Sequence, residues 1–343
     1  MVLKTDLECL REDNVKITVL GSGSWGATLA ILLFENGHDV TVWEFDATRA
    51  KYLQAGKIKP FKAGTVLPKG LIVTDSFEMF KDSDVVLFAV PSQYVRSTCE
   101  ILKNKGISFD EKIVISATKG VEANPVMRMS EVIEDVFGGI YKNIVVLSGP
   151  SHAEEVCKKK PTAIVSAAVN IDLAEKCRSL FMSDYFMVHT QTDVIGVEIG
   201  AALKNVFAVA SGIIDGLKCG DNTKAAIISR GFNELVKIGI ALGGKEQTFY
   251  GLSGLGDLIC TCFSKHSRNR AVGQAIGEGM SLEEAERNLG MVAEGVKNTI
   301  SAYRIGKELK LEIPIINGIH AVLFEGINPL KVINDLMTRA TNL

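Results

Sequence analysis

The fold is decided by residues 16–26, which read Lys-Ile-Thr-Val-Leu-Gly-Ser-Gly-Ser-Trp-Gly. The first five residues form a short apolar run that is typical of a buried strand. The spacing Gly-x-Gly-x-x-Gly follows directly, at Gly21, Gly23 and Gly26, and leads into a helix-compatible run at 27–36. This spacing alone is a weak signal, but between a strand and a helix it predicts a turn that binds the pyrophosphate of a dinucleotide.

Each part of this turn has a role in binding. Gly21 permits the tight turn, Gly23 lets the pyrophosphate approach the backbone, and Gly26 lets helix and strand pack closely. The helix N-terminus then offers unpaired N–H groups to the anion. The structural alternative is a glycine-rich turn in a sheet protein that binds nothing.

Glu44 ends the next expected strand and lies 23 residues after Gly21 (44 − 21). Its carboxylate suits the 2′-hydroxyl of a ribose and repels a 2′-phosphate, so NAD is favoured as the cofactor over NADP. Arg49 and Lys51 lie close by in the sequence and leave NADP open.

Near-continuous runs of Val and Ile predict further strands. Such runs are typical of a parallel sheet that helices cover on both faces. The segments between the runs are long enough for crossover helices, so we expect an α/β fold with a doubly wound, Rossmann-like parallel sheet. The expected strands are 16–20, 39–43, 84–90, 112–116 and 143–147, extended by 162–167 and 185–189.

The second half of the chain has a different composition. Residues 194–216 are rich in Ala, Gly, Ile and Val, and a periodic run at 223–242 lies between Asn222 and Gly243-Gly244, which predicts a helix with Asn222 as its N-cap. Further amphipathic helices are expected at 281–288 and 296–309. We therefore predict a dinucleotide-binding domain at 1–191 and an all-α substrate and catalytic domain at 192–343.

Composition excludes several classes of function. The chain has 343 residues with 38 Lys and Arg against 40 Asp and Glu, a net charge of −2, which excludes a globally basic nucleic-acid binder. No apolar run reaches the roughly 18–20 residues that cross a bilayer, and the acidic N-terminus resembles no signal or transit peptide, so no stable membrane insertion is expected.

The cysteines indicate a reducing environment and no metal site. There are seven, an odd number scattered over the whole length, which is typical of reduced thiols in the cytoplasm. Cys260, Cys262 and His266 form one local cluster, but three ligands at this spacing do not match a zinc pattern. We expect no metal.

Two lysines are candidates for acid–base chemistry. Lys204 lies in an apolar helix with Gly200 and Ala208 one turn away on either side, and we expect these small residues to leave space for a substrate over an ammonium of depressed pKa. The alternative is a lysine that extends to solvent at a helix edge. Lys119 follows the strand expected at 112–116, at the edge where doubly wound sheets bind ligands, although a solvated loop would also fit.

A basic cluster at 265–270 and a lone carboxylate complete the candidates. Arg268 belongs to this cluster, whose arginines and amides suit a phosphate dianion; the alternative is a solvated basic turn. Asp257 lies in an apolar, glycine-rich context, where it can cap a helix or pair with a catalytic ammonium, and spacing does not decide between them.

Several motifs, taken in order, are highly specific. They are Gly21-Ser22-Gly23-Ser24-Trp25-Gly26, Thr118-Lys119-Gly120, Ser148-Gly149-Pro150-Ser151, the stretches 200–206, 220–225 and 251–258, Ser267-Arg268-Asn269 and Val292-Ala293-Glu294-Gly295. In these motifs, from about residue 15 to 335, the chain closely resembles the NAD(P)-dependent glycerol-3-phosphate dehydrogenases.

The resemblance implies an activity and a role for each site residue. The activity is the reversible reduction of dihydroxyacetone phosphate, a phosphorylated triose, to glycerol 3-phosphate for phospholipid synthesis. Lys204 would be the proton donor and acceptor, with Lys119 and Asp257 as its partners. The remaining substrate contacts would come from Gly149, Ser151, Ser267, Arg268 and Asn269. The cofactor contacts would come from Gly21, Gly23, Ser24, Trp25, Gly26, Phe45, Lys119, Ala153, Arg268, Val292 and Glu294.

One position departs from many bacterial members of this family. They often have a basic residue after the second strand, where this chain has Glu44 and Phe45. Phe45 is similar to the aromatic residue that packs on adenine in relatives that prefer NAD.

Three other functions stay open. A different two-domain dehydrogenase would act on a hydroxy acid. A thiol-using, four-electron dehydrogenase would be built around Cys260. A non-catalytic module would sense NADH without turnover. A homodimer is one assembly open to the chain.

Overall fold

The computed structural model describes residues 14–59, 65–290 and 293–338, which form two compact units. The first unit contains the described residues up to Thr118, together with Met129–Val194. The second unit contains Lys119–Arg128 and the described residues from Ile195 onward. The predicted division into residues 1–191 and 192–343 does not account for Lys119–Arg128, which belongs to the second unit.

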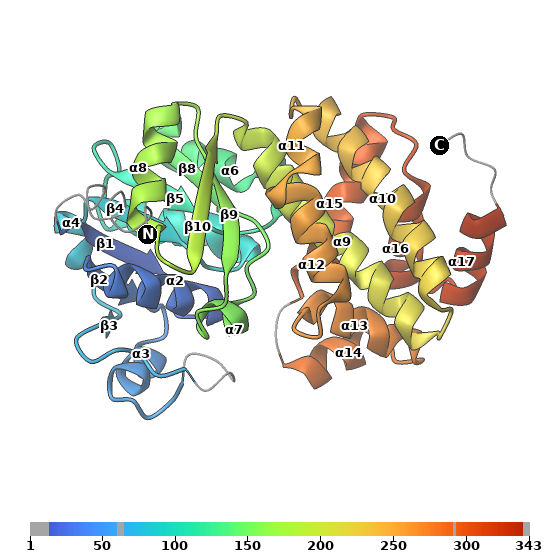
Figure 1. Ribbon diagram of the computed structural model, residues 1–343, viewed down its shortest axis with the longest axis horizontal. Helices are drawn as coiled ribbons and strands as arrows, with labels where there is room; N and C mark the ends of the chain where they lie inside the picture. The colour runs from blue at the N-terminus through green and yellow to red at the C-terminus, as the bar shows by residue number, and fades with distance from the viewer. Residues whose placement is uncertain (1–13, 60–64, 291–292, 339–343) are drawn as a thin grey trace. The chain divides into compact units, whose positions relative to one another are not determined.

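The first unit is built on an eight-stranded sheet with the order β10-β9-β8-β5-β4-β1-β2-β3 (Figure 1). All seven predicted strands are present, and the three-residue strand β3 was not predicted. The strands are β1 (Lys16–Leu20), β2 (Asp39–Trp43), β3 (Ile72–Thr74), β4 (Val85–Phe88), β5 (Ile113–Ser116), β8 (Ile144–Ser148), β9 (Thr162–Ala167) and β10 (Phe186–Gln191).

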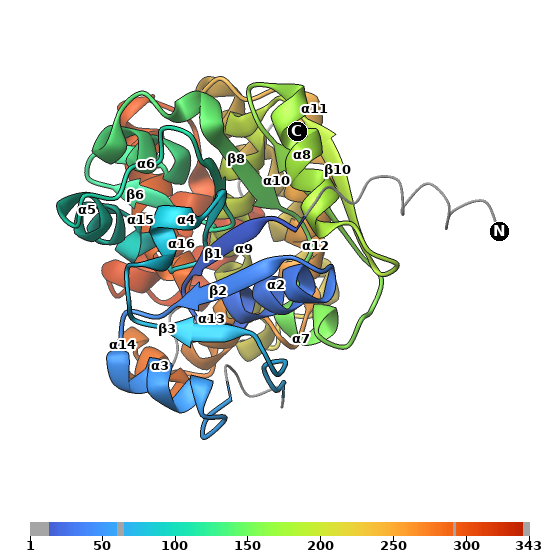
Figure 2. The same cartoon turned by 90° about the vertical axis from the view of Figure 1, so that its left-hand side faces the viewer.

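Helices cover both faces of this sheet. In Figure 2, α2 (Ser24–Glu35) and α8 (Ile171–Phe181) lie on one face, and α5 (Val95–Asn104) and α6 (Met129–Phe137) lie on the other. Every residue of β4 and β8 is buried, which explains why their sequences do not alternate between apolar and polar residues. The doubly wound α/β prediction is confirmed. The short helices α3 (Ala47–Gln54), α4 (Met79–Asp82) and α7 (Ala153–Val156) and the 3₁₀ turns η1 (Ser92–Tyr94) and η2 (Tyr141–Asn143) complete the unit.

The sheet departs from the predicted all-parallel arrangement at one junction. Strand β9 pairs antiparallel with β8, whereas all the other pairs of this sheet are parallel. The connection from β8 to β9 contains only the four-residue helix α7. A parallel connection needs a crossover element that carries the chain back along the sheet, and one helical turn is too short for this.

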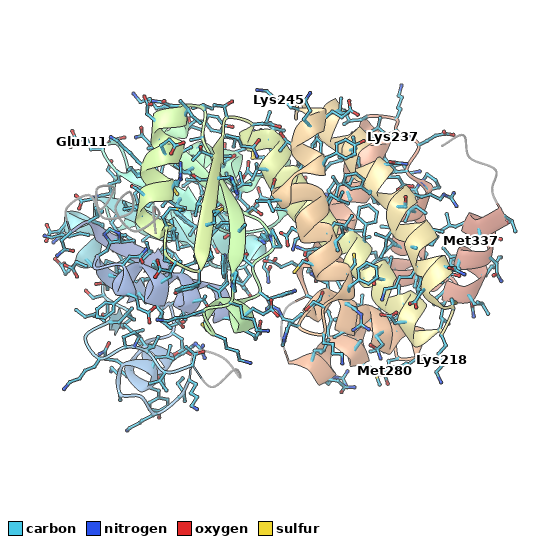
Figure 3. All side chains as sticks on the ribbon, in the orientation of Figure 1. Glu111, Lys218, Lys237, Lys245, Met280 and Met337 are labelled. Carbon is cyan, nitrogen blue, oxygen red and sulfur yellow. The ribbon has the colours of Figure 1, made fainter. Side chains whose placement is uncertain are left out.

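In the part of the second unit that the structure describes, the chain is helical apart from one antiparallel hairpin, which was not predicted. The hairpin joins β6 (Val121–Ala123) to β7 (Val126–Arg128). The helices are α9 (Val194–Gly216), α10 (Asp221–Ala241), α11 (Glu246–Tyr250), α12 (Asp257–Phe263), α13 (Arg268–Gly277), α14 (Leu282–Leu289), α15 (Glu294–Glu308), α16 (Pro314–Phe324) and α17 (Pro329–Thr338), with a π-helical turn η3 (Leu252–Gly256) before α12. Lys237 on α10 and Met337 on α17 lie on the outside of this unit (Figure 3).

Helix α9 forms the core of this unit. Its length and a mean hydropathy of 1.5 over an 18-residue window would suit a bilayer, although the sequence showed no apolar run of that length. The whole window is buried within the protein, as in the core helix of a folded domain. Its glycines explain how closely α13 approaches it. A Cβ on Gly212 would lie 1.9 Å from the carbonyl oxygen of Arg270, and a Cβ on Gly273 would lie 2.0 Å from that of Val209. The two backbones are therefore in direct contact.

The start of α10 corrects one detail. The helix begins at Asp221 with Gly220 as its N-cap, so Asn222 lies inside the first turn and the predicted Asn222 cap is wrong. Gly220 has a φ of +84°, which glycine adopts without strain.

Candidate active site

Asp257 holds two lysine ammonium groups in the second unit. Lys204 Nζ donates to Asp257 Oδ1 at 2.7 Å, and Lys119 Nζ donates to Asp257 Oδ2 at 2.8 Å. Lys204 comes from the middle of α9, Asp257 from the first residue of α12, and Lys119 from the segment that leads into β6. The structure thus brings together the three residues that the sequence named for acid–base chemistry, and Asp257 makes ion pairs with both lysines.

The cluster is buried and carries a net positive charge. The side chain of Lys204 is 6% exposed and that of Asp257 is 3% exposed, while Lys119 at 16% is closer to solvent. Burial lowers the pKa of the Lys204 ammonium, and the charge of Lys119 lowers it further, although Asp257 acts in the opposite direction. Burial would raise the pKa of the Asp257 carboxyl, but Lys119 and Lys204 outweigh it and hold that pKa below its usual range.

Thr261 is a member of this cluster that the sequence did not indicate. Its Oγ1 accepts a hydrogen bond from Lys204 Nζ at 2.7 Å and donates to the backbone oxygen of Asp257, also at 2.7 Å. Thr261 lies one helical turn after Asp257 on α12, so the spacing Asp-x-x-x-Thr places both on one face. This four-residue spacing from Asp257 is the feature of the sequence that indicates Thr261.

Gly200 has a different role from the one predicted. A Cβ at this position would lie 3.0 Å from the backbone oxygen of Ser253 and 3.3 Å from Gly254 Cα. Gly200 therefore lets the segment before Asp257 pack directly on α9. Ala208 is fully buried in the apolar core. The prediction that these small residues leave space for a substrate over Lys204 is wrong, because protein atoms occupy the side of Gly200.

The first turn of α13 lies next to the neighbour of Lys204. Asn269 Nδ2 donates to Asn205 Oδ1 at 2.9 Å, and Asn269 Oδ1 accepts from the backbone N–H of Gly295 at 2.9 Å. The Asn269 amide thus joins α13 to α9 and α15. Ser267 is the N-cap and accepts from the N–H of Arg270 at 3.2 Å.

Arg268 is the exposed cation at this helix terminus. Within the described residues, no ion pair or hydrogen bond engages its guanidinium, and the backbone N–H groups of Arg268 and Asn269 have no partner. Arg270, by contrast, binds Asp215 through Nε at 2.7 Å, so it is not available to an anion in the same way. A free guanidinium beside free N–H groups at a helix N-terminus is suited to a phosphate dianion.

The glycine loop of the first unit has the shape that a dinucleotide requires. Gly21 has a φ of +104°, and a Cβ on Gly26 would lie 2.0 Å from the Gly21 carbonyl oxygen, whereas a Cβ on Gly23 would meet nothing within 4 Å. In the part of the chain that the structure describes, the backbone N–H groups of Ser24, Trp25 and Gly26 have no hydrogen-bond partner. Open space over Gly23 and three free donors fit the pyrophosphate of a dinucleotide.

The carboxylate of Glu44 lies beside this loop after β2. Ser22 Oγ donates a short hydrogen bond to Glu44 Oε2, and Arg49 Nε lies 3.4 Å from the same oxygen and 3.2 Å from Ser22 Oγ. Glu44 Oε1 accepts from the backbone N–H of Asp46 at 3.1 Å. Phe45 is 72% exposed, with its ring edge-on to that of Trp43.

The remaining predicted site residues lie in three places. Trp25 and Ala153 belong to one small apolar cluster with Ala27, and the indole nitrogen of Trp25 is buried with no protein partner among the described residues. Gly149 follows β8, where a Cβ would lie 2.8 Å from the Cα of Ile164, and Ser151 Oγ donates to the Gly149 oxygen at 3.0 Å. Glu294 is the first residue of α15, and Val292 lies outside the described residues.

The described residues contain no group of three or more His, Cys, Asp or Glu side chains arranged to hold a metal ion. The buried Cys262 has its pKa raised to about 12 by burial, so its sulfur is a neutral thiol.

Comparison with known proteins shows the same similarity over nearly the whole chain. Residues 16–174 match the family model described as NAD-dependent glycerol-3-phosphate dehydrogenase N-terminus, and residues 193–334 match the corresponding C-terminus model. Glycerol-3-phosphate dehydrogenase [NAD(P)+] of Fusobacterium nucleatum is 46% identical over 331 residues, covering 96% of this chain and 98% of that protein. The enzyme of the same name from Thermoanaerobacter is 45% identical over 326 residues, covering 95% and 97%. The crystal structure of glycerol-3-phosphate dehydrogenase from Coxiella burnetii has a TM-score of 0.89 at 31% identity, covering 95% of this chain and 99% of that one.

Proposed function

Because the chain belongs to the NAD-dependent glycerol-3-phosphate dehydrogenase family, we propose that it catalyses the reversible reduction of dihydroxyacetone phosphate to sn-glycerol 3-phosphate with NAD(P)H. The observation that carries the chemistry is the buried ammonium of Lys204, bonded to Asp257 and Thr261. A ketone that receives a hydride must also receive a proton, and a positioned ammonium of lowered pKa is a suitable source.

When bound, the nicotinamide dinucleotide would supply the hydride that the C2 carbonyl of the substrate needs. Lys204 donates a proton to the C2 oxygen as its C–O double bond becomes single, and it becomes a neutral amine. In the reverse direction, the amine removes the proton from the hydroxyl. The lowered pKa of Lys204 brings the two protonation states closer in free energy, so the residue can act in both directions.

Lys119 and Asp257 adjust the charge around this proton transfer. Lys119 adds positive charge near the substrate oxygen, where negative charge develops in the transition state, so its effect is larger there than in the ground state. Asp257 orients both ammonium groups and keeps Lys204 protonated before the reaction, because its carboxylate offsets part of the cost of burying that charge.

The phosphate of the substrate is assigned to the start of α13. Arg268 contributes a charged fork, and the free backbone N–H groups of Arg268 and Asn269 contribute further donors. The side-chain amide of Asn269 already binds Asn205 and Gly295, so its contribution to phosphate binding comes from its backbone. Ser267 acts by capping the helix. Gly149 and Ser151 remain proposed substrate contacts.

The dinucleotide is assigned to the glycine loop of the first unit. Gly21, Gly23, Ser24 and Gly26 would hold the pyrophosphate, and the exposed ring of Phe45 would pack on the adenine. The other proposed cofactor contacts are Trp25, Lys119, Ala153, Arg268, Val292 and Glu294.

The direct test is NADH oxidation with dihydroxyacetone phosphate. Lys204→Ala should lower kcat by about 10²–10⁴-fold, the range for loss of a general acid, while NADH binding stays unchanged. Lys237→Ala removes an exposed lysine of the same unit and serves as the matched control. If Lys204→Ala keeps more than about a tenth of the activity, the general-acid assignment is wrong.

A substrate panel separates this function from its competitors. The phosphate assignment predicts that unphosphorylated dihydroxyacetone is a poor substrate. Preference for a hydroxy acid would indicate the other dehydrogenase. NADH binding without turnover would indicate a sensor, and substrate-protected inactivation by a thiol reagent would indicate chemistry at Cys260. We also propose that the chain works in the cytoplasm and supplies glycerol 3-phosphate for phospholipid synthesis, with a homodimer as its assembly.

A further inference from the structure

We infer that Arg49 binds the 2′-phosphate of NADP, and that its ion pair with Glu44 lets one site accept both NAD and NADP. Glu44 accepts the 2′-hydroxyl of the adenosine ribose when NAD is bound. Arg49 is the cation that offsets Glu44 and contacts the phosphate when NADP is bound. The inference rests on the proposed function, because it concerns the dinucleotide used in that reaction.

Three side chains place this pair at the glycine loop. Ser22, inside the loop, donates to Glu44 Oε2, and Arg49 Nε contacts both Glu44 Oε2 at 3.4 Å and Ser22 Oγ at 3.2 Å. Glu44 follows β2, the strand whose end carries the ribose contact in this type of fold. The Arg49 guanidinium therefore lies beside the Glu44 carboxylate, to which the 2′-hydroxyl is assigned. Both side chains also contact Ser22 of the glycine loop.

The charges of Arg49 and Glu44 explain how their ion pair affects the choice between NAD and NADP. A carboxylate alone at this position would repel a 2′-phosphate dianion, and the site would be specific for NAD. Arg49 partly neutralises Glu44. Its side chain is 37% exposed, so the guanidinium is accessible to a ligand, whereas that of Glu44 is 14% exposed. Arginine presents several N–H donors, so one guanidinium can contact the carboxylate and the phosphate together.

Among the described residues of the segment from Glu44 to Lys51, Arg49 has no equivalent as a cation beside Glu44. Phe45, directly after Glu44, has no charge. Lys51 is exposed and lies two positions after Arg49 on α3, so it projects from a different side of that helix. Asp46 uses its carboxylate to cap α3 by accepting from the N–H groups of Thr48 and Arg49, at 2.8 Å and 3.0 Å. This cap holds the first turn of α3, and with it Arg49, beside the loop.

The test compares NADH and NADPH, which differ only in the 2′-phosphate. Dissociation constants are measured by calorimetry on the full-length protein without substrate, so the result does not depend on turnover. Arg49→Gln should weaken NADPH binding by about tenfold or more and change NADH binding by less than about threefold, because a charge-assisted contact to the phosphate is lost. Glu44→Gln should have the opposite effect on selectivity: tighter NADPH binding and weaker NADH binding.

Lys51→Gln is the matched control, since it removes the same charge from the same helix. It should leave the NADPH-to-NADH ratio of dissociation constants within about twofold of wild type, because exposed charges off the site are screened. The inference is overturned if Arg49→Gln leaves this ratio unchanged, weakens both dinucleotides equally, or has no more effect than Lys51→Gln. Turnover with dihydroxyacetone phosphate is measured separately: its absence with dinucleotide binding intact rejects the proposed reaction and leaves the Arg49 result standing.

Discussion

Arg128 Nη1 donates to Glu198 Oε2 at 2.6 Å, and the two side chains are only 9% and 3% exposed. This buried ion pair connects the β6–β7 hairpin to α9, the helix that carries Lys204. Two hydrogen bonds connect the hairpin to α15. Ser301 Oγ donates to the backbone oxygen of Val121 at 2.9 Å, and Arg304 Nη1 donates to that of Ala123 at 2.8 Å. Lys119 lies directly before this hairpin, so we expect the pair to position the proposed catalytic lysine without touching it.

Arg128→Met should therefore reduce stability and turnover together. It leaves Glu198 buried without its cation, which costs about 3–5 kcal/mol in comparable cases. Arg128→Met/Glu198→Met should recover much of the thermal stability, because no unpaired charge remains. The exposed Lys237→Gln, on α10, serves as the control. A single Arg128→Met variant with wild-type melting temperature and kcat would contradict the positioning role.

The pH dependence of the reduction should follow the protonation of Lys204. Its pKa is below the usual lysine value, so kcat should fall as pH rises through that lowered pKa, where the proton donor is lost. Lys119→Met removes a positive charge, raises the pKa of Lys204 and should move this limb to higher pH. Asp257→Asn removes the negative charge and should move it to lower pH.

These opposite shifts are read from pH–rate profiles of the two variants, each of which also loses activity. Shifts in the same direction, or an unchanged limb in both, would show that another group controls the profile. NADH affinity, measured in parallel, separates an effect on proton transfer from an effect on binding.

Thr261→Val should lower kcat by about tenfold, because it removes a hydrogen-bond acceptor of Lys204 at nearly constant volume. Thr261→Ser retains the hydroxyl and should retain most of the activity, which makes it the matched control. A loss in Thr261→Ser with full activity in Thr261→Val would indicate that packing of the threonine methyl matters, and the hydroxyl does not.

Glu234 should make folding stability depend on pH near neutrality. Its carboxylate accepts from the N–H groups of Ile315 and Ile316 at the start of α16, at 2.7 Å and 3.0 Å, and burial raises its pKa to about 7. Between the unfolded value of 4.5 and about 7, the folded protein binds a proton that the unfolded chain does not. Its contribution to stability is therefore fully present at pH below 4.5 and is lost as pH rises towards 7.

The measurement compares wild type with Glu234→Gln by urea unfolding at pH 5 and pH 8. The variant does not titrate, so the free energy of unfolding of wild type relative to the variant should decrease by roughly 2–3 kcal/mol over this range. A difference that is constant or increases with pH would contradict the raised pKa.

The parts of the site that the sequence predicted are local. The strand, the glycine loop and the helix at 16–36 follow from spacing over a few residues, and all seven predicted strands appear because sheet burial produces continuous apolar runs. Details that depend on packing were wrong: the reversal at β9, the cap of α10 and the role of Gly200. Thr261 was missed, although it is only four residues from Asp257.

The sequence by itself determined the two kinds of architecture, the dinucleotide loop and the family, because these depend on periodicity and on ordered motifs. Only the tertiary structure decided which charges are paired. Lys204 and Lys119 are 53 and 138 residues from Asp257, and Arg49 is bound to the same carboxylate oxygen as Ser22 in the loop. The physical reason is that a buried charge must find a partner in space, and folding places that partner without regard to its distance along the chain.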